Sequence, residues 1–331
     1  MKVVTDWVTQ ILGGKFTLSR IVGDASFRQY FRLHLNGKYY VLMDSHPDYA
    51  PIDPFVTITH TLKKAQVKVP NIIAENHANG FILLTDLGDS HYLENLKLGN
   101  EKELYELALK TLSKIQSADS SQLPQYDEEQ FNDETQLFST WFLNRHLGIR
   151  FSTREKKQFE EVMSRLNSTA LDQPKCFVHR DYHSRNLMIC DNKAVGVLDY
   201  QDAVLGPITY DLASLLRDAY INCPQTLLTQ LVERFFIDAT KKGLVTGSLG
   251  RFFRWFDWAG VQRHLKIAGI FCRLHYRDDK PDYLNHIPLT LKYLEEITAG
   301  YEELIFIHEL FQRYQLHQRL RDANRCISNT L

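Results

Sequence analysis

The hydrophobic pattern at the start of the chain is that of β-structure. In 29–44, two runs of strand-forming residues flank Asn36 and Gly37, a dipeptide typical of tight hairpins. The apolar stretch 81–88 predicts a buried strand that enters a turn, and 53–66 predicts a helix. The first part of the chain is therefore predicted to be rich in β-strand, with one helix between the strands.

After Gly88, apolar residues recur every three or four positions, which is the spacing of one helix face. One such face comprises Leu104, Leu107, Ala108, Leu112 and Ile115. Helical patterns also cover 131–148 and return from about 209 to the end. Ser152 and Glu155 form a possible capping box at the start of another helix.

Strand-like residues interrupt the helical region in 175–200, where two short apolar runs flank a turn. The whole pattern predicts an α+β fold with two lobes. The N-lobe is expected to cover residues 1–88 and to consist of a β-sheet with one helix. The C-lobe, 89–331, is expected to be mainly helical.

Composition narrows the class of protein. The 331 residues include 39 basic and 40 acidic ones, which argues against a nucleic-acid surface or a polybasic membrane patch. The N-terminus lacks the features of a signal peptide, and no apolar run is long enough to span a bilayer. The five cysteines are scattered among apolar neighbours, as in reduced proteins. We therefore expect a cytoplasmic protein with a small-molecule substrate and no nucleic-acid or membrane partner. A monomer fits this composition, but the oligomeric state stays open.

The strand-like segment contains polar residues whose spacing indicates a function. His179, Arg180 and Asp181 follow an apolar run, Asn186 comes five residues after Asp181, and a short hairpin then leads to Asp199. This arrangement matches the H-R-D-x-x-x-x-N catalytic loop of kinases, followed by a metal-binding aspartate. Phosphoryl transfer needs a carboxylate near the acceptor hydroxyl and oxygen ligands for Mg²⁺. Asp181 is therefore the predicted base, and Asn186 and Asp199 are predicted magnesium ligands.

Two stretches around this motif resemble a known superfamily. They are HRDYHSRNLMI (179–189) and GVLDYQDAVLGPITYDLASLLRDAY (196–220). They are similar to the aminoglycoside phosphotransferase/choline kinase superfamily. Within it, the chain more closely resembles the bacterial N-acetylmuramate/N-acetylglucosamine anomeric kinases of cell-wall recycling. Supporting stretches are 23–32, 41–47, 83–89, 141–148 and 262–278. The resemblance implies a protein-kinase-like fold in which ATP and Mg²⁺ bind between the lobes.

The resemblance also implies roles for residues outside the catalytic motif. Asp86 and Leu87 belong to the hinge that offers backbone groups to adenine. The segment 23–32 corresponds to the phosphate-covering loop, and its implied nucleotide-binding residues are Ser26, Phe27, Arg28 and Arg32. Asp211 corresponds to an aspartate that, with His179, supports the catalytic loop. From the local sequence alone, a plain helix N-cap is an equally good interpretation of Asp211.

The chain departs from the kinase pattern at two linked positions. Met43 stands where the third strand of a kinase carries a phosphate-binding Lys, and the helix 53–66 lacks the Glu that pairs with it. Loss of both partners avoids an unpaired charge near the cleft. Arg28 and Arg32 are the candidates to neutralise the triphosphate instead, although two solvent-facing strand residues would look the same. If these losses abolish catalysis, the chain is a nucleotide-binding regulator.

The acceptor implied by the resemblance is the C1 hydroxyl of N-acetylmuramate or N-acetylglucosamine. A hemiacetal hydroxyl is more acidic than an ordinary alcohol, so a weak base such as Asp181 suffices. The lactyl carboxylate of a muramic sugar calls for a cation. Candidate acceptor-binding residues are Arg145, Gln201, Asp202, Arg263, His264 and Lys266. For the last three residues, a solvated helix face is the alternative.

Aminoglycosides are the competing acceptors. Such polycations require an acidic cleft, whereas the acidic runs found here, at 127–129 and 278–279, are short. This favours a neutral or anionic sugar but leaves an aminoglycoside or another small alcohol open. Trp255 and Trp258 could stack on a sugar ring, although their neighbourhood is more typical of a hydrophobic core.

Overall fold

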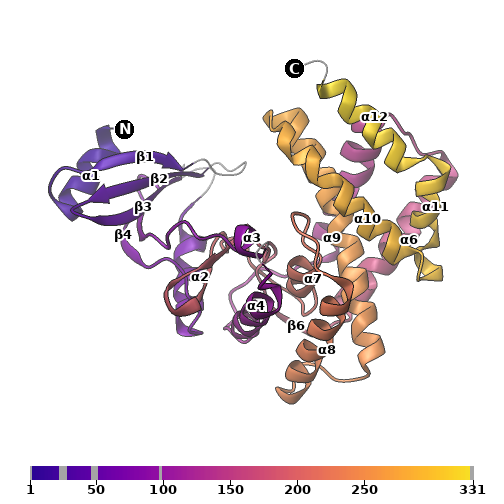
Figure 1. Ribbon diagram of the computed structural model, residues 1–331, viewed down its shortest axis with the longest axis horizontal. Helices are drawn as coiled ribbons and strands as arrows, with labels where there is room; N and C mark the ends of the chain where they lie inside the picture. Colours follow the sequence, from indigo (N-terminus) through magenta and orange to yellow (C-terminus); the bar gives the residue numbers. More distant parts are fainter. Residues whose placement is uncertain (1, 22–27, 46–50, 97–98, 329–331) are drawn as a thin grey trace.

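The computed structural model describes residues 2–21, 28–45, 51–96 and 99–328 (Figure 1). Its N-terminal part is a five-stranded antiparallel sheet with the strand order β1-β2-β3-β5-β4. The strands are β1 (Thr17–Ile21), β2 (Arg28–Leu35), β3 (Lys38–Ser45), β4 (Ile72–Asn76) and β5 (Phe81–Thr85). Asn36 and Gly37 join β2 to β3 with φ values of 50° and 76°, the left-handed geometry of a tight hairpin turn. The predicted hairpin and the predicted buried strand are therefore confirmed.

Two helices cover the two faces of this sheet, α1 (Lys2–Leu12) and α2 (Asp53–Lys64). Because side chains alternate along a strand, neighbouring residues point to opposite faces. Leu42 and Leu83 pack with the apolar residues of α1, whereas Met43 and Ile82 pack with those of α2. The helix predicted in 53–66 is thus confirmed, and it lies on the face that also contacts the rest of the chain.

The remainder of the chain is mainly helical, as the periodicity predicted. Its helices are α3 (Tyr92–Asn95), α4 (Glu101–Gln116), α5 (Glu128–Leu137), α6 (Thr153–Leu171), α7 (Tyr210–Leu216), α8 (Gln225–Lys241), α9 (Leu249–Asp278), α10 (Ile287–Thr298), α11 (Ile305–Arg313) and α12 (Leu316–Ser328). The short helix η4 (Pro281–His286) lies between α9 and α10, and η5 (Glu302–Leu304) lies between α10 and α11. A further short helix, η3 (Asp191–Lys193), lies in the turn between the strands β7 (Leu187–Ile189) and β8 (Val195–Val197). The long helix α9 packs against α5, α6, α7 and α10 and forms the centre of this lobe (Figure 1).

The helix predicted over 131–148 has two parts. The α-helix α5 ends at Leu137 and continues as the π-helix η2 (Phe138–His146). Gly269 of α9 approaches this junction so closely that a Cβ there would lie 2.3 Å from the carbonyl carbon of Leu137. The capping box is confirmed at the start of α6, where Ser152 accepts from the backbone of Glu155 and Glu155 accepts from the backbone of Ser152.

Four short strands interrupt the helices. They are β6 (Lys175–Val178), β7 (Leu187–Ile189), β8 (Val195–Val197) and β9 (Val204–Pro207). The hairpin β7–β8 was predicted, whereas the pairing of β6 with β9 was not. The backbone N–H of Val197 donates to the carbonyl of Lys68 (2.9 Å), and that of Ile189 donates to Ser90 (2.8 Å). These bonds tie the hairpin to Lys68, which lies between α2 and β4, and to Ser90, which follows β5.

One hydrophobic core runs through both parts of the molecule. It extends from Met43 and Ile82 of the sheet through Phe55 of α2 to Tyr200, and from there to α4, α7 and α8. The α+β, two-lobed prediction is thus confirmed, while the proposed division at residue 88 stays a prediction. Within the described ranges, no helix combines the length and the apolar character needed to cross a membrane.

Candidate active site

The predicted catalytic loop, residues 179–186, connects β6 to β7 and is held by a buried carboxylate. The backbone N–H groups of His179 and Arg180 donate to the two oxygens of Asp211 at 2.6 and 3.0 Å. Arg180 has a φ of 76°, a left-handed conformation that is costly for a side-chain-bearing residue and needs such support. Asp211 lies in the first turn of α7, but its carboxylate bonds the catalytic loop, which favours the bracing role over the N-cap interpretation.

The side chain of His179 supports the same loop from the other side. Its Nε2 donates to the carbonyl of Leu198 (3.0 Å), and its Nδ1 accepts from the N–H of Asp181 (3.3 Å). Burial lowers the pKa of His179, although the nearby Asp211 and Asp181 carboxylates oppose this. A neutral imidazole therefore links Asp181 to the residue that precedes Asp199.

Asp181 and Asn186 lie close together in this loop. The amide nitrogen of Asn186 donates to the carbonyl of Asp181 (3.0 Å), which leaves the amide oxygen for the predicted role as a magnesium ligand. The carboxylate of Asp181 is 44% exposed, so a substrate can reach it. The loop turns tightly, because the N–H of Ser184 is held by the buried carboxylate of Asp218 at 2.8 Å.

Asp199 carries the features of a cation ligand. Its φ is 62°, again left-handed, and the Nε2 of Gln201 donates to its carboxylate (2.9 Å) and to that of Asp202 (3.2 Å). Desolvation in the cleft, together with the charges of Asp181 and Asp202, raises the pKa of Asp199 to about 6 although Gln201 opposes the shift. A carboxylate whose pKa is raised by its carboxylate neighbours fits a site for a divalent cation.

The donor set at this place suits Mg²⁺. Asn186 and Asp199 supply hard oxygen ligands, and a nucleotide-bound magnesium takes most of its other ligands from phosphate and water. Two protein ligands therefore suffice, which agrees with the absence of any group of three or more His, Cys, Asp or Glu suited to a metal in the described ranges.

A buried charge network surrounds Asp181, and its central residue, Glu134, was missed by the sequence analysis. Glu134 of α5 pairs with Lys266 (2.8 Å) and with Arg180, and it accepts from the Tyr126 hydroxyl. Its pKa is lowered because Lys266 and Arg180 outweigh its desolvation. No local signal marks Glu134, since its partners come from distant parts of the chain.

The cations of this network keep Asp181 ionised. Arg263 donates to the carbonyl of Arg180 (2.8 Å) and approaches the Asp181 carboxylate at 3.5 Å. Desolvation raises the pKa of Asp181, but the charges of Lys266 and Arg263 outweigh it, so the pKa lies below its usual range. Arg263 and Lys266 thus face the loop and Glu134, which differs from the predicted role of binding the acceptor.

Two other predicted acceptor residues lie away from the loop. His264 is fully buried, and its ring nitrogens contact the backbone carbonyls of Gly260 (2.5 Å) and Arg217 (3.0 Å), so it belongs to the core. Arg145 is exposed and stacks on Tyr276 at 5.1 Å. Tyr276 lies thirteen residues beyond Arg263 on α9, or about 20 Å at 1.5 Å per residue. The structure therefore does not support either residue as an acceptor ligand.

Two further residues of the acceptor prediction lie next to Asp199. Gln201 uses its amide nitrogen to bridge the carboxylates of Asp199 and Asp202. Binding of sugar hydroxyls by Gln201 and Asp202 stays a prediction. Trp255 and Trp258 are 5% and 3% exposed and lie in the hydrophobic core. Neither tryptophan presents a face to a ligand.

In the N-terminal sheet, Arg32 contacts the segment that follows β5. Its guanidinium pairs with Asp86 (2.6 Å) and Asp89 and donates to the carbonyl of Gly88 (3.2 Å). Asp86 also accepts from the N–H of Gly88 (2.8 Å), which shapes the turn. The positive charge of Arg32 is compensated there, so the prediction that it neutralises the triphosphate is not supported. Contact of Leu87 with adenine stays a prediction.

Arg28 is placed differently from Arg32. It begins β2, and its positive charge opposes the rise in the pKa values of Asp199 and Tyr30, which places it near these two residues. Tyr30 is paired in register with Met43, the residue that replaces the kinase Lys. Arg28 therefore remains the candidate to neutralise phosphate charge. Ser26 and Phe27 lie outside the described residues.

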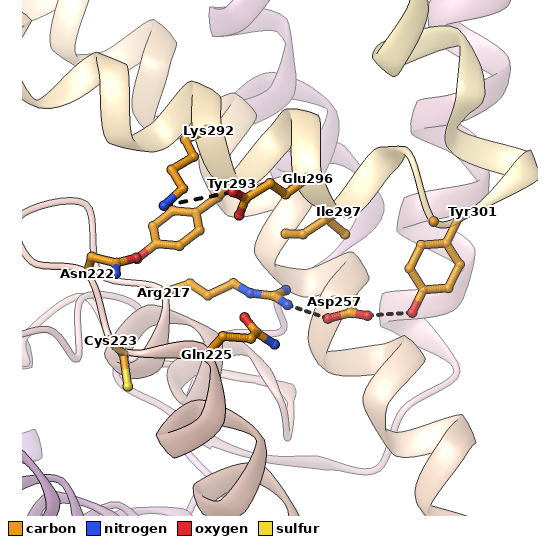
Figure 2. A pocket seen from close by; sticks show the side chains of 11 residues that line it. Arg217, Asn222, Cys223, Gln225, Asp257, Lys292, Tyr293, Glu296, Ile297 and Tyr301 are labelled. Carbon is orange, nitrogen blue, oxygen red and sulfur yellow. Dashed lines mark hydrogen bonds and ion pairs between the residues drawn. The ribbon is translucent and has the colours of Figure 1, made fainter.

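Figure 2 shows a pocket of about 700 Å³ between α10 and the segment 217–225. Inside it, Arg217 donates to Asp257 (2.5 Å), which also accepts from the Tyr301 hydroxyl (2.5 Å). None of the predicted site residues lines this pocket. Its ion pair connects the end of α7 to α9.

Comparison with known proteins agrees with this geometry. Residues 17–243 match the model of the phosphotransferase enzyme family. The N-acetylmuramate/N-acetylglucosamine kinase of Pseudomonas aeruginosa is 43% identical over 87% of this chain and 85% of its own. The protein of the same name from Neisseria meningitidis is 39% identical over 89% of this chain and 90% of its own.

Solved structures share the fold at low sequence identity. The choline kinase LicA from Streptococcus pneumoniae superposes with a TM-score of 0.64 at 12% identity, covering 91% of this chain and 99% of its own. An ADP-bound aminoglycoside phosphotransferase superposes with a TM-score of 0.60 at 14% identity, covering 89% and 98%.

Proposed function

The chain belongs to the phosphotransferase enzyme family, and we propose that it transfers the γ-phosphoryl group of ATP to the C1 hydroxyl of N-acetylmuramate or N-acetylglucosamine. The observation that carries this proposal is the 43% identity over 87% of the chain to a protein named N-acetylmuramate/N-acetylglucosamine kinase. The exposed, ionised Asp181 beside two metal-type ligands supports it independently. The product would be a sugar 1-phosphate formed during peptidoglycan recycling in the cytoplasm, where ATP is made.

Asp181 acts as the base in this proposal. Lys266 and Arg263 keep its carboxylate ionised, which lowers its basicity. A weak base is adequate because the anomeric hydroxyl is more acidic than an ordinary alcohol. Asp181 therefore orients the hydroxyl and accepts its proton as the bond to phosphorus forms. Asp211 and His179 hold the loop so that this carboxylate stays in place.

The nucleotide lies between the sheet and the catalytic loop. Asn186 and Asp199 would hold Mg²⁺, which neutralises phosphate charge when bound. Arg28 adds a positive charge at the start of β2, on the side of Asp199. Asp86 and Leu87 contribute the hinge at which the adenine binds.

The test is an ADP-release assay with Mg-ATP and a panel of N-acetylmuramate, N-acetylglucosamine, choline and kanamycin. We expect turnover with the two amino sugars, and NMR of the product should place the phosphate at C1. Turnover with kanamycin alone would replace this acceptor by an aminoglycoside. Nucleotide binding without any turnover would instead support a regulator and contradict the proposal.

A further inference from the structure

Tyr30, which the sequence analysis did not single out, lies on the face of the sheet that contacts the rest of the chain. Along β2, Phe31 and Leu33 pack with the apolar residues of α1, so Tyr30 points to the opposite face. Its ring packs against the core that also contains Tyr200, the residue after Asp199. Tyr30 therefore lies between the sheet and the segment that carries a predicted magnesium ligand.

The cross-strand neighbour of Tyr30 is the residue that replaces the kinase lysine. Tyr30 is paired in register with Met43 of β3, and Met43 is paired with Ile82 of β5. Directly opposed residues of antiparallel strands point to the same face, with Cβ atoms roughly 5 Å apart. Met43 is fully buried and has no hydrogen-bond donor in its side chain. Of these three side chains, only that of Tyr30 can donate a hydrogen bond where the lysine is absent.

The hydroxyl of Tyr30 has no hydrogen-bond partner within the described part of the chain, although charged groups surround it. Desolvation and the charges of Asp199 and Asp202 raise the pKa of Tyr30, while Arg28 opposes the shift. The phenol therefore keeps its proton at neutral pH and can act as a donor. The residue is only half-buried, so part of it is accessible to a ligand.

A protonated phenol at this position suits a phosphate oxygen. Hydrogen bonds to a charged acceptor are shorter and stronger than those between neutral groups. A phenol can also lie beside the buried Met43 without the desolvation cost of an ammonium group. The nucleotide of the proposed function lies between the sheet and the catalytic loop, so its phosphates would pass close to this hydroxyl.

We propose that the hydroxyl of Tyr30 donates a hydrogen bond to a phosphate oxygen of the bound nucleotide, in place of the lysine that kinases carry on the neighbouring strand. This inference rests on the use of ATP in the proposed function and not on the identity of the acceptor. The exchange gives up the charge of the lysine but keeps a directed hydrogen bond. Neutralisation of the phosphate charge is left to other groups.

The first measurement compares ligands with and without phosphate. Calorimetric titration gives the Kd of the unmodified protein and of Tyr30→Phe for a non-hydrolysable Mg-ATP analogue and for adenosine. Tyr30→Phe should weaken binding of the analogue about 10- to 100-fold, the range for losing a charge-assisted hydrogen bond, and leave adenosine unchanged. An equal loss with both ligands, or no loss with either, would overturn the inference.

Denaturant unfolding shows whether the hydroxyl acts on the ligand or on the fold. Because the hydroxyl has no partner within the described residues, Tyr30→Phe should leave the free energy of unfolding of the free protein nearly unchanged. At one concentration of the analogue, the variant should gain less stability than the unmodified protein, since the gain depends on the ratio of ligand concentration to Kd. A clearly destabilised free variant, or an equal gain, would contradict the proposal.

Tyr40→Phe is the matched control. Tyr40 belongs to β3 of the same sheet but packs with the residues of α1 on the other face, so its loss of a hydroxyl should leave both Kd values unchanged. A loss as large as that of Tyr30→Phe would contradict a specific role of Tyr30. If the unmodified protein does not bind the analogue, the proposed function fails together with this inference. If the unmodified protein and both variants bind it equally well, the inference alone fails.

Discussion

At the scale of single residues, the site is defined by charges that keep one carboxylate ionised. The sequence motif predicted Asp181, Asn186 and Asp199, because their residue types and spacing follow from the chemistry of phosphoryl transfer. It could not predict Glu134, whose partners Arg180 and Lys266 are brought to it by the fold. For the same reason it assigned Arg263 and Lys266 to the acceptor, since a sequence pattern identifies a cation but not the group it faces.

Asp181→Asn tests the role of the base. An amide cannot accept the proton of the acceptor, so kcat should fall about 10²- to 10⁴-fold, the usual contribution of general base catalysis. The affinity for Mg-ATP should stay nearly the same, because Asn186 and Asp199 are intact. Turnover of both amino sugars and calorimetric titration with a non-hydrolysable ATP analogue measure the two quantities. An unchanged kcat would remove Asp181 from the mechanism.

At the scale of elements, the position of Glu134 depends on how closely α5 approaches α9. Leu137, at the end of α5, contacts Gly269, and Glu134 and Lys266 form their ion pair about one turn away. The π-helix that follows Leu137 was not predictable, because its apolar spacing resembles that of an α-helix. The helix pair itself could be predicted from periodicity, but not the close contact that aligns it.

Gly269→Ala tests this contact. Alanine normally favours a helix by about 1 kcal/mol over glycine, but here its Cβ would meet the backbone of Leu137, which cannot rotate away. We expect a net loss of about 1–3 kcal/mol in the free energy of unfolding, together with a lower kcat. Denaturant unfolding measures the first effect. Gly250→Ala is the control on the same helix, where no atom lies within 4 Å, and it should be neutral or slightly stabilising. A stable, fully active Gly269→Ala variant would contradict this account.

A second element-scale prediction concerns Glu155, which joins the start of α6 to the end of α11. Its carboxylate accepts from the Ser152 N–H (2.9 Å), the Tyr314 hydroxyl (2.7 Å) and Arg313 (2.9 Å). Although desolvation opposes them, these bonds lower its pKa from 4.5 to about 2. Because the folded state has the lower pKa, Glu155 stabilises the fold above pH 4.5, and this stabilisation is lost as the pH falls towards 2.

Glu155→Gln should therefore destabilise the protein by roughly 1 kcal/mol at neutral pH. The difference in unfolding free energy between the two proteins should shrink between about pH 4.5 and 2. Denaturant titrations at a series of pH values measure it, and Glu160→Gln, an exposed glutamate of the same helix, controls for the lost charge. A difference that does not depend on pH would contradict the assigned pKa.

At the scale of the whole molecule, the two lobes are joined by a contact that the sequence analysis did not foresee. The absence of the Lys and the Glu of the kinase pattern could be read from the sequence. The contact that takes the place of their ion pair could not. Phe55 of α2 stacks on Tyr200 with ring centroids 5.0 Å apart, and the Thr59 and Tyr200 hydroxyls are 2.8 Å apart. Tyr200 directly follows Asp199. Helix α2 therefore reaches the segment that carries Asp199, the predicted magnesium ligand, through a neutral hydrogen bond.

The hydroxyl of Thr59 donates to the carbonyl of Phe55 (2.7 Å), so Tyr200 is the donor in the bond to Thr59. Thr59→Val and Tyr200→Phe each remove one partner with little change of shape. The double-mutant cycle should give a coupling of about 0.5–1.5 kcal/mol in the free energy of unfolding. Each single variant should also raise the KM for Mg-ATP, because Asp199 loses its link to α2. Both residues are fully buried, so neither substitution changes a contact with solvent. If the effects of the two substitutions on the free energy of unfolding are additive and the KM for Mg-ATP is unchanged, this hydrogen bond does not couple the two lobes.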